Sequence, residues 1–248
     1  MDKLKTYLKH PLSFVLLILI GLASIITVAS IIFIIIYILV NGIPNLTTDL
    51  FSLHYNSKNQ SMLPSIFNTV FITFLTLLIA VPIGIFSAVY LVEYAKKGSK
   101  LVKVIRVTTE TLAGIPSIVF GLFGFLAFVI ALGWGYSMIA GVLTLVMMVL
   151  PTIIRTTEEA LLAVPNSYRE GSFGLGAGKI RTIFKIIVPT AIPGILSGVI
   201  LAIGRIVGET AALIYTSGTV AETATSLTDS ARTLSVHLYC LLSEGLFT

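Results

Sequence analysis

Residues 12–40 read LSFVLLILIGLASIITVASIIFIIIYILV, a run of 29 residues without one charged side chain. A helix needs about 20 consecutive apolar residues to cross a bilayer, so this run is long enough to span one. It continues past the small residues Ala29 and Ser30, and it is longer than the apolar core of a signal peptide. We therefore predict an uncleaved transmembrane helix at this position.

Further apolar stretches of spanning length follow at 64–92, 112–132, 137–154 and 186–215. The whole chain is 56% hydrophobic and 11% charged, whereas about a quarter of the residues in a soluble domain are charged. This composition excludes a water-soluble fold and predicts an all-α, polytopic bundle of five transmembrane helices. The one cysteine, Cys240, excludes an internal disulfide and a cysteine-based metal cluster, and we expect it to be a small buried residue.

The basic side chains predict how these helices cross the membrane. With the N-terminus placed inside, thirteen Lys and Arg residues fall on the inner side, whereas Lys58 and Arg232 fall outside and Arg205 lies within the last span. Because basic residues favour the cytoplasmic side of short loops, the N-terminus is predicted to be cytoplasmic. The net charge is +5, but the basic residues are scattered over three connections without interleaved aromatic residues. This distribution does not indicate nucleic-acid binding.

This topology places segment 41–63, the turn 133–136 and the segment after Tyr215 outside. Trp134 and Tyr136 are then expected to anchor the chain at the membrane interface. His54 and His237 are expected to be isolated surface residues with no role in metal binding. The inner connection 155–185 is longer than a bare link between two helices requires, so a cytoplasmic partner is expected to use it.

A motif lies within that inner connection. Residues 170–176 read EGSFGLG, and after nine residues IIVP follows at 186–189. Physically, the pattern suits a short helix, a turn that glycine allows and a second helix at the membrane surface. The Gly-rich stretch is not a phosphate-binding P-loop, because Ile180 follows Lys179 where Ser or Thr is required.

The spacing of the motif resembles the EAA loop of ABC importer permeases. The matching acidic, small, glycine and proline positions are Glu170, Gly171, Ser172, Gly176 and Pro189. The resemblance implies that these residues form a coupling helix that docks on a cytoplasmic ATPase. The alternative is a surface helical hairpin with no special purpose.

Two charges fall inside the last predicted span. If the helix runs to Tyr215, Arg205 lies near mid-membrane, where a charge costs at least about 2.5–3.5 kcal/mol. Glu209 follows four residues later, so the two side chains are expected to share a helix face and to pair. Small residues on this stripe, Gly198 and Ala202 among them, allow close helix packing. The pair is either a structural ion pair or part of a substrate pathway in which the guanidinium binds an oxyanion.

Two further segments carry a closer resemblance. Residues 112–124, LAGIPSIVFGLFG, and 205–212, RIVGETAA, resemble the PstA permeases of the bacterial phosphate ABC importer, and 151–160 and 235–237 are similar too. The bend implied by Gly114 and Pro116 would free backbone amides and place Ser117 on the pathway with Arg205, Glu209 and Thr210. The alternative is an ordinary proline at a helix entrance.

The resemblance implies an assembly and a division of the chain. The partners would be a second, PstC-like permease, a PstB-like ATPase that holds ATP and Mg²⁺, and a PstS-like extracytoplasmic phosphate-binding protein. This chain would be a non-catalytic subunit that binds no cofactor or metal. Its parts would be an N-terminal helix and loop at 1–63, a core permease domain at 64–215 with a coupling loop at 155–189, and an external tail at 216–248. The family's usual sixth span is absent from this sequence.

Three alternatives remain open from the residues. The chain could be the sister phosphate permease, or a permease of the same kind for another oxyanion or small solute. A secondary transporter or channel would work without an ATPase. An intramembrane enzyme is disfavoured, because no paired carboxylates or Ser, His and Lys constellation lies at membrane depth.

Overall fold

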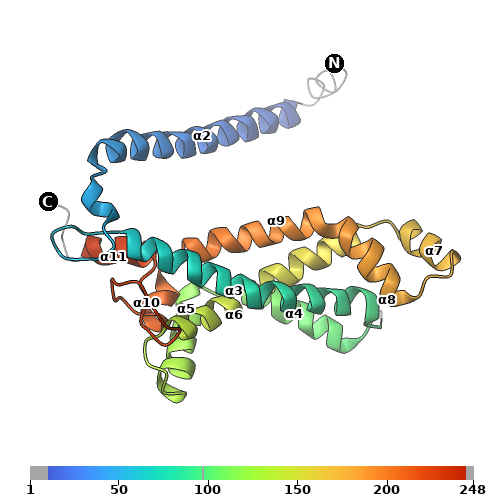
Figure 1. Cartoon of the computed structure of the whole chain (residues 1–248). Helices are drawn as coiled ribbons and strands as arrows, with labels where there is room; N and C mark the ends of the chain where they lie inside the picture. The colour runs from blue at the N-terminus through green and yellow to red at the C-terminus, as the bar shows by residue number, and fades with distance from the viewer. Residues whose placement is uncertain (1–10, 97, 244–248) are drawn as a thin grey trace. The chain divides into compact units, whose positions relative to one another are not determined.

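The computed structural model describes residues 11–96 and 98–243, and the regular elements within them are helices (Figure 1). The chain divides into two compact units, Met1–Leu50 and Phe51–Thr248. The first contains α2 (Pro11–Gly42) and the short helix η1 (Ile43–Asn45), and η2 (Thr48–Phe51) crosses the boundary. The all-helical prediction is confirmed for these residues.

The second unit holds the other helices, and several of them contain π-helical turns. In chain order they are α3 (Leu63–Val89), η3 (Tyr90–Tyr94), α4 (Lys100–Ala113), α5 (Ser117–Gly124), η4 (Phe125–Ala131), α6 (Met138–Leu162), α7 (Asn166–Gly174), α8 (Lys179–Thr182), η5 (Ile183–Ile187), α9 (Val188–Val207), α10 (Ala211–Thr216) and α11 (Leu234–Ser243).

Helix α2 has the properties of a lipid-facing span. Its apolar window has a mean hydropathy of 2.9, and none of that window is buried among the described residues. Two of its hydroxyl groups bond within the helix, since Ser24 donates to the carbonyl of Ile20 at 2.8 Å and Thr27 to that of Ala23 at 2.9 Å. A helix that satisfies its own polar groups can lie in lipid.

The number of spans agrees with the prediction. Four stretches, 12–45, 63–94, 138–162 and 179–207, are long and apolar enough to cross a membrane. Residues 102–113 and 117–131 form a bent pair that counts as a fifth span if taken as one. The bend between them is 101°. It lies at residues 114–116, where Pro116 has an extended backbone before α5 begins at Ser117. The predicted bend at this proline is therefore confirmed.

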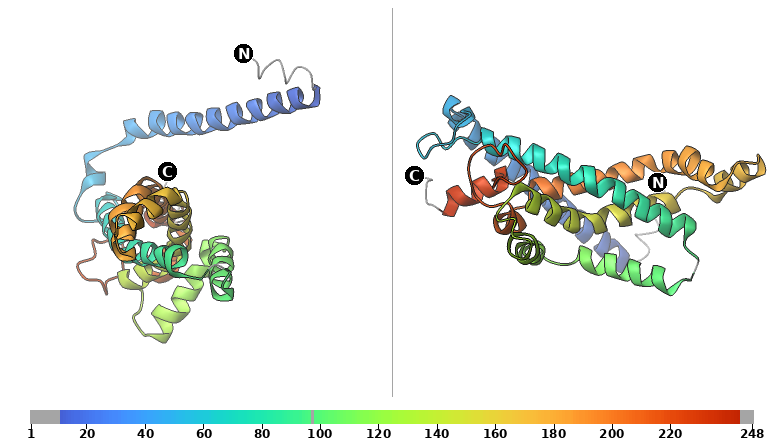
Figure 2. Two further views of the ribbon diagram at one scale, coloured as in Figure 1. Left: turned by 90° about the vertical axis from the view of Figure 1, so that its right-hand side faces the viewer. Right: turned by 60° about the horizontal axis from the view of Figure 1, so that its bottom comes forward.

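Helix α6 is the centre of the second unit. It packs against α3, α9, α4 and α5, and 61% of its apolar window is buried, against 33% for 63–94 and 28% for 179–207. Figures 1 and 2 show α3, α6 and α9 running alongside one another. Gly84 lets α3 approach closely, because a Cβ atom there would lie 2.5 Å from Cγ2 of Ile153 on α6. The predicted small-residue contact of α9 is also present, since Gly198 faces Thr156.

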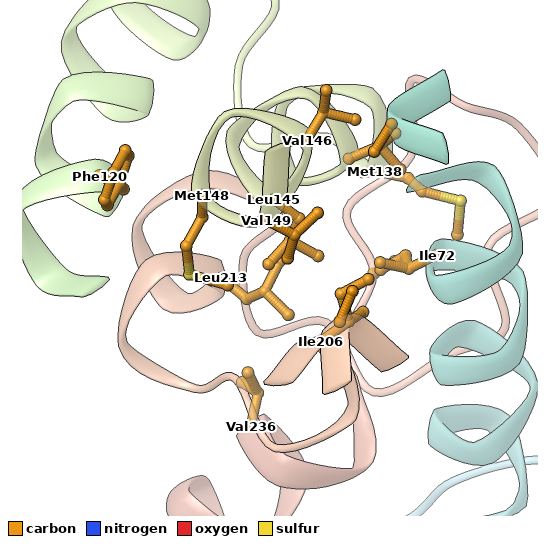
Figure 3. Close-up of a cluster of buried hydrophobic side chains, with 14 of the residues drawn as sticks. Ile72, Phe120, Met138, Leu145, Val146, Met148, Val149, Ile206, Leu213 and Val236 are labelled. Carbon is orange, nitrogen blue, oxygen red and sulfur yellow. The ribbon is translucent and has the colours of Figure 1, made fainter. Parts of the chain in front are cut away.

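Apolar side chains from several helices meet at one end of this bundle (Figure 3). The cluster is built around Leu145 and Met148 of α6, with Ile72 of α3, Ile206 of α9 and Leu213 of α10 packed against them. Cys240 of α11 is part of the same cluster and is buried, as predicted. In a membrane, tight packing of this kind holds helices together through van der Waals contact.

Two predicted element boundaries were wrong. The last span ends at Val207, and after Gly208 a separate short helix, α10, begins at Ala211. Glycine is a poor residue for a helix interior, which is the local reason for the break. The second helix of the inner motif, α8, continues through η5 into α9, so it begins a span and is no separate surface helix.

The segment after Tyr215, predicted as an external tail, packs into the second unit. Ala231 and Val236 are fully buried in the apolar cluster. Asn68 of α3 donates to the carbonyls of Glu222 and Arg232 at 2.9 and 3.2 Å, and accepts the N–H of Ala224 at 3.0 Å. One buried amide thereby fastens the loop 219–233 to α3.

Candidate functional site

The predicted pathway residues lie around the break between α9 and α10. Arg205 stands in the last turn of α9, where a cation is favoured by the helix dipole. Glu209 lies beyond the end of that helix and is 7% exposed. Its Oε1 accepts the N–H of Ala212 at 3.0 Å, which satisfies a free donor in the first turn of α10. Glu209 therefore stabilises the start of α10.

The predicted pairing of Arg205 with Glu209 was wrong. Among the described residues, neither an ion pair nor a hydrogen bond joins these two side chains. The prediction assumed a continuous helix in which positions four apart share a face, but α9 ends at Val207. Arg205 is half-buried, and in the described part of the chain its guanidinium forms no ion pair.

The other two predicted pathway residues lie on elements that pack together. Ser117 is the first residue of α5, and Thr210 directly precedes α10; both are half-buried. Helices α5 and α10 touch closely, since a Cβ atom on Gly121 would lie 2.7 Å from the Cα of Ala212. The structure thus joins the start of α5 to the region after α9, although Arg205 and Ser117 share no described contact.

Four of the five predicted coupling residues lie on a hairpin, 166–182, between α6 and α9, and the fifth, Pro189, lies in α9 itself. Helix α7 carries Glu170 and Gly171, both exposed, and Gly176 turns the chain with a φ of +81°. A residue with a side chain rarely adopts this backbone conformation, so the glycine is required there. Ser172 is buried, and its hydroxyl shares a hydrogen bond of 2.8 Å with that of Thr182 on α8. Pro189 is exposed in the first turn of α9.

Large apolar side chains on this hairpin point away from the protein. Leu175 is 91% exposed and Ile180 is 68% exposed, and Tyr168 and Phe173 are each about half exposed. Exposed apolar side chains gathered in one place are typical of a protein interaction surface. The motif predicts a partner surface at this place but leaves these four positions unspecified, so it does not identify the residues.

A charged cavity of about 280 Å³, which was not predicted from the sequence, lies where η3, α4 and α6 meet. Arg106 of α4 pairs with Glu158 of α6 at 2.5 Å, and Arg155 pairs with Glu110 at 3.5 Å and with Glu159 at 3.1 Å. The Arg155 pairs are more than half exposed, and exposed pairs contribute little to stability. Helix spacing predicts the Arg155 pair with Glu159, whereas the pairs that reach α4 depend on the tertiary fold.

A second missed group lies at the other end of the second unit. Arg232 and His237 are 3% and 1% exposed, and the Tyr55 ring contacts both. The ring is edge-on to His237 with centroids 5.8 Å apart, and the Arg232 guanidinium carbon lies 4.9 Å from its centroid. Burial and the nearby Arg232 charge lower the pKa of His237 to about 4. The prediction of His237 as a surface residue was wrong, whereas His54 is exposed as predicted.

Comparison with known proteins supports the family assignment. Residues 80–236, which include the hairpin and the α9–α10 break, match the family described as binding-protein-dependent transport system inner membrane component. The chain belongs to this family. Members are subunits of ABC transporters that are placed in the membrane, in agreement with the spans described above.

This permease is also similar to individual proteins of the family. It is 35% identical to the probable ABC transporter permease protein YqgI of Bacillus subtilis over 241 residues, which cover 91% of this chain and 82% of YqgI. It is 45% identical to the phosphate transport system permease protein PstA 1 of Mycobacterium tuberculosis over 140 residues, 56% of this chain and 45% of that protein. It is 36% identical to PstA of Xylella fastidiosa over 178 residues, 71% and 62% of the two chains. The permease is thus PstA-like, and its matches to PstA proteins span about half of their length.

Proposed function

We propose that this permease is a subunit of an ATP-driven phosphate importer in the bacterial cytoplasmic membrane, with its N-terminus in the cytoplasm. It would form half of the translocation pathway and perform no bond-breaking itself. The observation that carries the proposal is the hairpin 166–182, which projects large apolar side chains outward beside the acidic Glu170. A surface of this composition is suited to a protein partner, because exposed apolar side chains are buried when the partner binds.

The partners follow from the same proposal. A PstB-like ATPase would bind the hairpin and would hold ATP and Mg²⁺. A PstC-like permease would supply the other half of the pathway, and a PstS-like protein would deliver phosphate from outside. ATP-driven closure of the ATPase would displace the hairpin, and the spans α6 and α9 that it connects would move with it.

Arg205 is the residue proposed to meet phosphate. A guanidinium offers a planar set of N–H donors that fits an oxyanion, and Arg205 is free of a carboxylate partner among the described residues. Glu209 has a different proposed role, because its carboxylate holds the first turn of α10 and so fixes the backbone beside Thr210. Ser117 and Thr210 would add hydroxyl groups on the two elements that pack together.

Phosphate uptake by cells that express the whole transporter tests this proposal. We expect Arg205→Ala to lose uptake and Arg205→Lys to recover only part of it, because lysine keeps the charge but not the planar donors. Lys58→Ala is the matched control, since it removes an exposed cation from the external loop. Normal uptake by Arg205→Ala at normal expression would remove Arg205 from the pathway.

Two further measurements separate the alternatives. An excess of sulfate or molybdate should not inhibit uptake of radiolabelled phosphate, whereas inhibition would indicate a different oxyanion as substrate. The ATPase should co-purify with the permease. Active transport by a preparation without any ATPase would indicate a secondary transporter or channel instead.

A further inference from the structure

Arg169, at the middle of α7, connects three helices through one guanidinium. Its Nε and Nη2 donate to Oε1 of Glu93 on η3 at 3.0 and 2.8 Å. Its Nη2 also donates to the carbonyl of Leu161 at 3.1 Å, and its Nη1 donates to the carbonyl of Val164 at 2.9 Å. The hairpin is therefore joined to the end of the α3 span and to the end of the α6 span by the same side chain.

This connection is shielded from solvent. The side chains of Arg169 and Glu93 are 16% and 10% exposed. The carbonyls of Leu161 and Val164 belong to the end of α6 and the turn after it, where backbone acceptors lack partners within the helix. Loss of the guanidinium would leave the Glu93 carboxylate and both carbonyls without this donor, so removing Arg169 costs more than removing one partner of an exposed ion pair.

Apolar packing does little to hold α7 in place. Ser172 is the one buried residue among those described in α7, and the large apolar side chains of the helix, Tyr168 and Phe173, are exposed. The orientation of α7 thus depends on polar contacts, namely those of Arg169 and the hydrogen bond between Ser172 and Thr182. A second link reaches the same turn of η3, since Nζ of Lys179 lies 4.5 Å from the ring centroid of Tyr94.

We propose that Arg169 is a positioning residue for coupling: its contact with Glu93 transmits movement of the docked hairpin to the α3 span as well as to α6. This inference rests on the proposed function, because it requires an ATPase at the hairpin. The chain itself connects α7 to α6 and, through α8, to α9. Span α3 has no such direct chain connection to the hairpin, and its links to the hairpin run through Glu93 and, on the same turn of η3, through Tyr94.

The experiment measures phosphate transported per ATP hydrolysed by the complete, purified transporter in proteoliposomes. Arg169→Gln and Glu93→Gln should both retain the ATPase subunit and its ATP hydrolysis. Each should lower transport per ATP by roughly five- to tenfold, at the low end of coupling between sites. The double variant should be no worse than either single variant, because both remove the same contact. Lys103→Gln, which removes an exposed cation from α4, should match the wild type.

Glu93 makes the test independent of docking, since it lies on η3 and not on the hairpin. Unchanged transport per ATP in Glu93→Gln would overturn the proposal, whatever Arg169→Gln does. Loss of the ATPase subunit from both variants would also overturn it, because the pair would then serve docking. Failure of the proposed function looks different: the wild-type transporter itself would retain no ATPase or would import phosphate without ATP.

Discussion

The buried amide of Asn68 donates to the backbone carbonyl of Glu222, 154 positions later in the chain, at 2.9 Å. The same side chain binds the carbonyl of Arg232 and the N–H of Ala224. Three backbone groups of the loop 219–233 thus depend on one side chain of α3. Asp229 orders the loop from within, because its carboxylate accepts the N–H groups of Thr225 and Ser226.

Asn68→Ala should therefore weaken this end of the second unit. A buried polar group left without its partner costs about 1–3 kcal/mol, so we expect a lower midpoint of thermal unfolding in detergent and faster proteolysis within 219–233. Asn41→Ala is the control, since that amide is exposed and binds the carbonyl of Tyr37 in its own helix. Equal shifts in the two variants would show that the loop does not depend on Asn68.

The low pKa of His237 predicts a dependence of stability on pH. Above about pH 6.5 the imidazole is neutral in both the folded and the unfolded chain, so it does not lower the free energy of unfolding. As the pH falls from about 6.5 towards about 4, the unfolded chain gains a proton that the folded chain excludes, and the free energy of unfolding decreases. Below that range the imidazole is protonated in the folded state too, and it causes no further decrease in the free energy of unfolding.

Thermal unfolding of His237→Phe measures this effect. The variant keeps an aromatic ring against Tyr55 but has no group to protonate, so its midpoint should fall less than that of the wild type on acidification. His54→Phe should keep the wild-type dependence, because His54 is exposed. An unchanged pH dependence in His237→Phe would mean that the imidazole does not contribute to it.

The contact between α5 and α10 should tolerate no added carbon at Gly121. A Cβ atom there meets the backbone of Ala212, which cannot move aside as a flexible side chain can. Gly121→Ala is expected to destabilise the protein by about 1–3 kcal/mol and to lower phosphate uptake with it. Gly204→Ala should do neither, since the space around Gly204 is open. Similar unfolding midpoints for the two variants would refute the close contact.

The sequence predicted the spans and the bend, because both depend on local properties. Apolar length marks a span wherever it occurs, and Pro116 lacks the N–H that would continue a helix. Proline alone does not decide the bend, since Pro82, Pro151 and Pro193 lie inside helices. Arg205 and Glu209 show where local reasoning fails. Their spacing suits an ion pair only within a continuous helix, and the apolar pattern does not end where α9 ends.

Contacts between segments that are far apart in the sequence could not be predicted from residue spacing. Glu93 and Arg169 are 76 positions apart, and both belong to connections that look like ordinary charged inner segments. His237 looked exposed because it follows a polar loop, yet packing of Tyr55 and α11 buries it. The hairpin was identified through the resemblance of its motif, whereas its exposed apolar residues needed the structure.

The side of the membrane on which the hairpin lies can be measured with one new cysteine. Cys240 is buried, so it can be replaced by Ala to give a background without thiols, and Leu175→Cys then adds a highly exposed one. A membrane-impermeant maleimide should label this cysteine only after the cytoplasmic face is opened. Ser57→Cys, at an exposed position of the loop that is proposed to be external, should be labelled in intact cells. The reverse pattern would contradict the proposed orientation.

Binding of an ATPase to the hairpin 166–182 can be measured by cross-linking from the hairpin's most exposed side chain. A photo-reactive amino acid is placed at Leu175, which is 91% exposed, in cells that express all subunits of the transporter. We expect a covalent adduct between the permease and the ATPase, and no such adduct from the exposed position Ser57. Adducts from position 175 that never contain the ATPase, in cells that import phosphate normally, would contradict it.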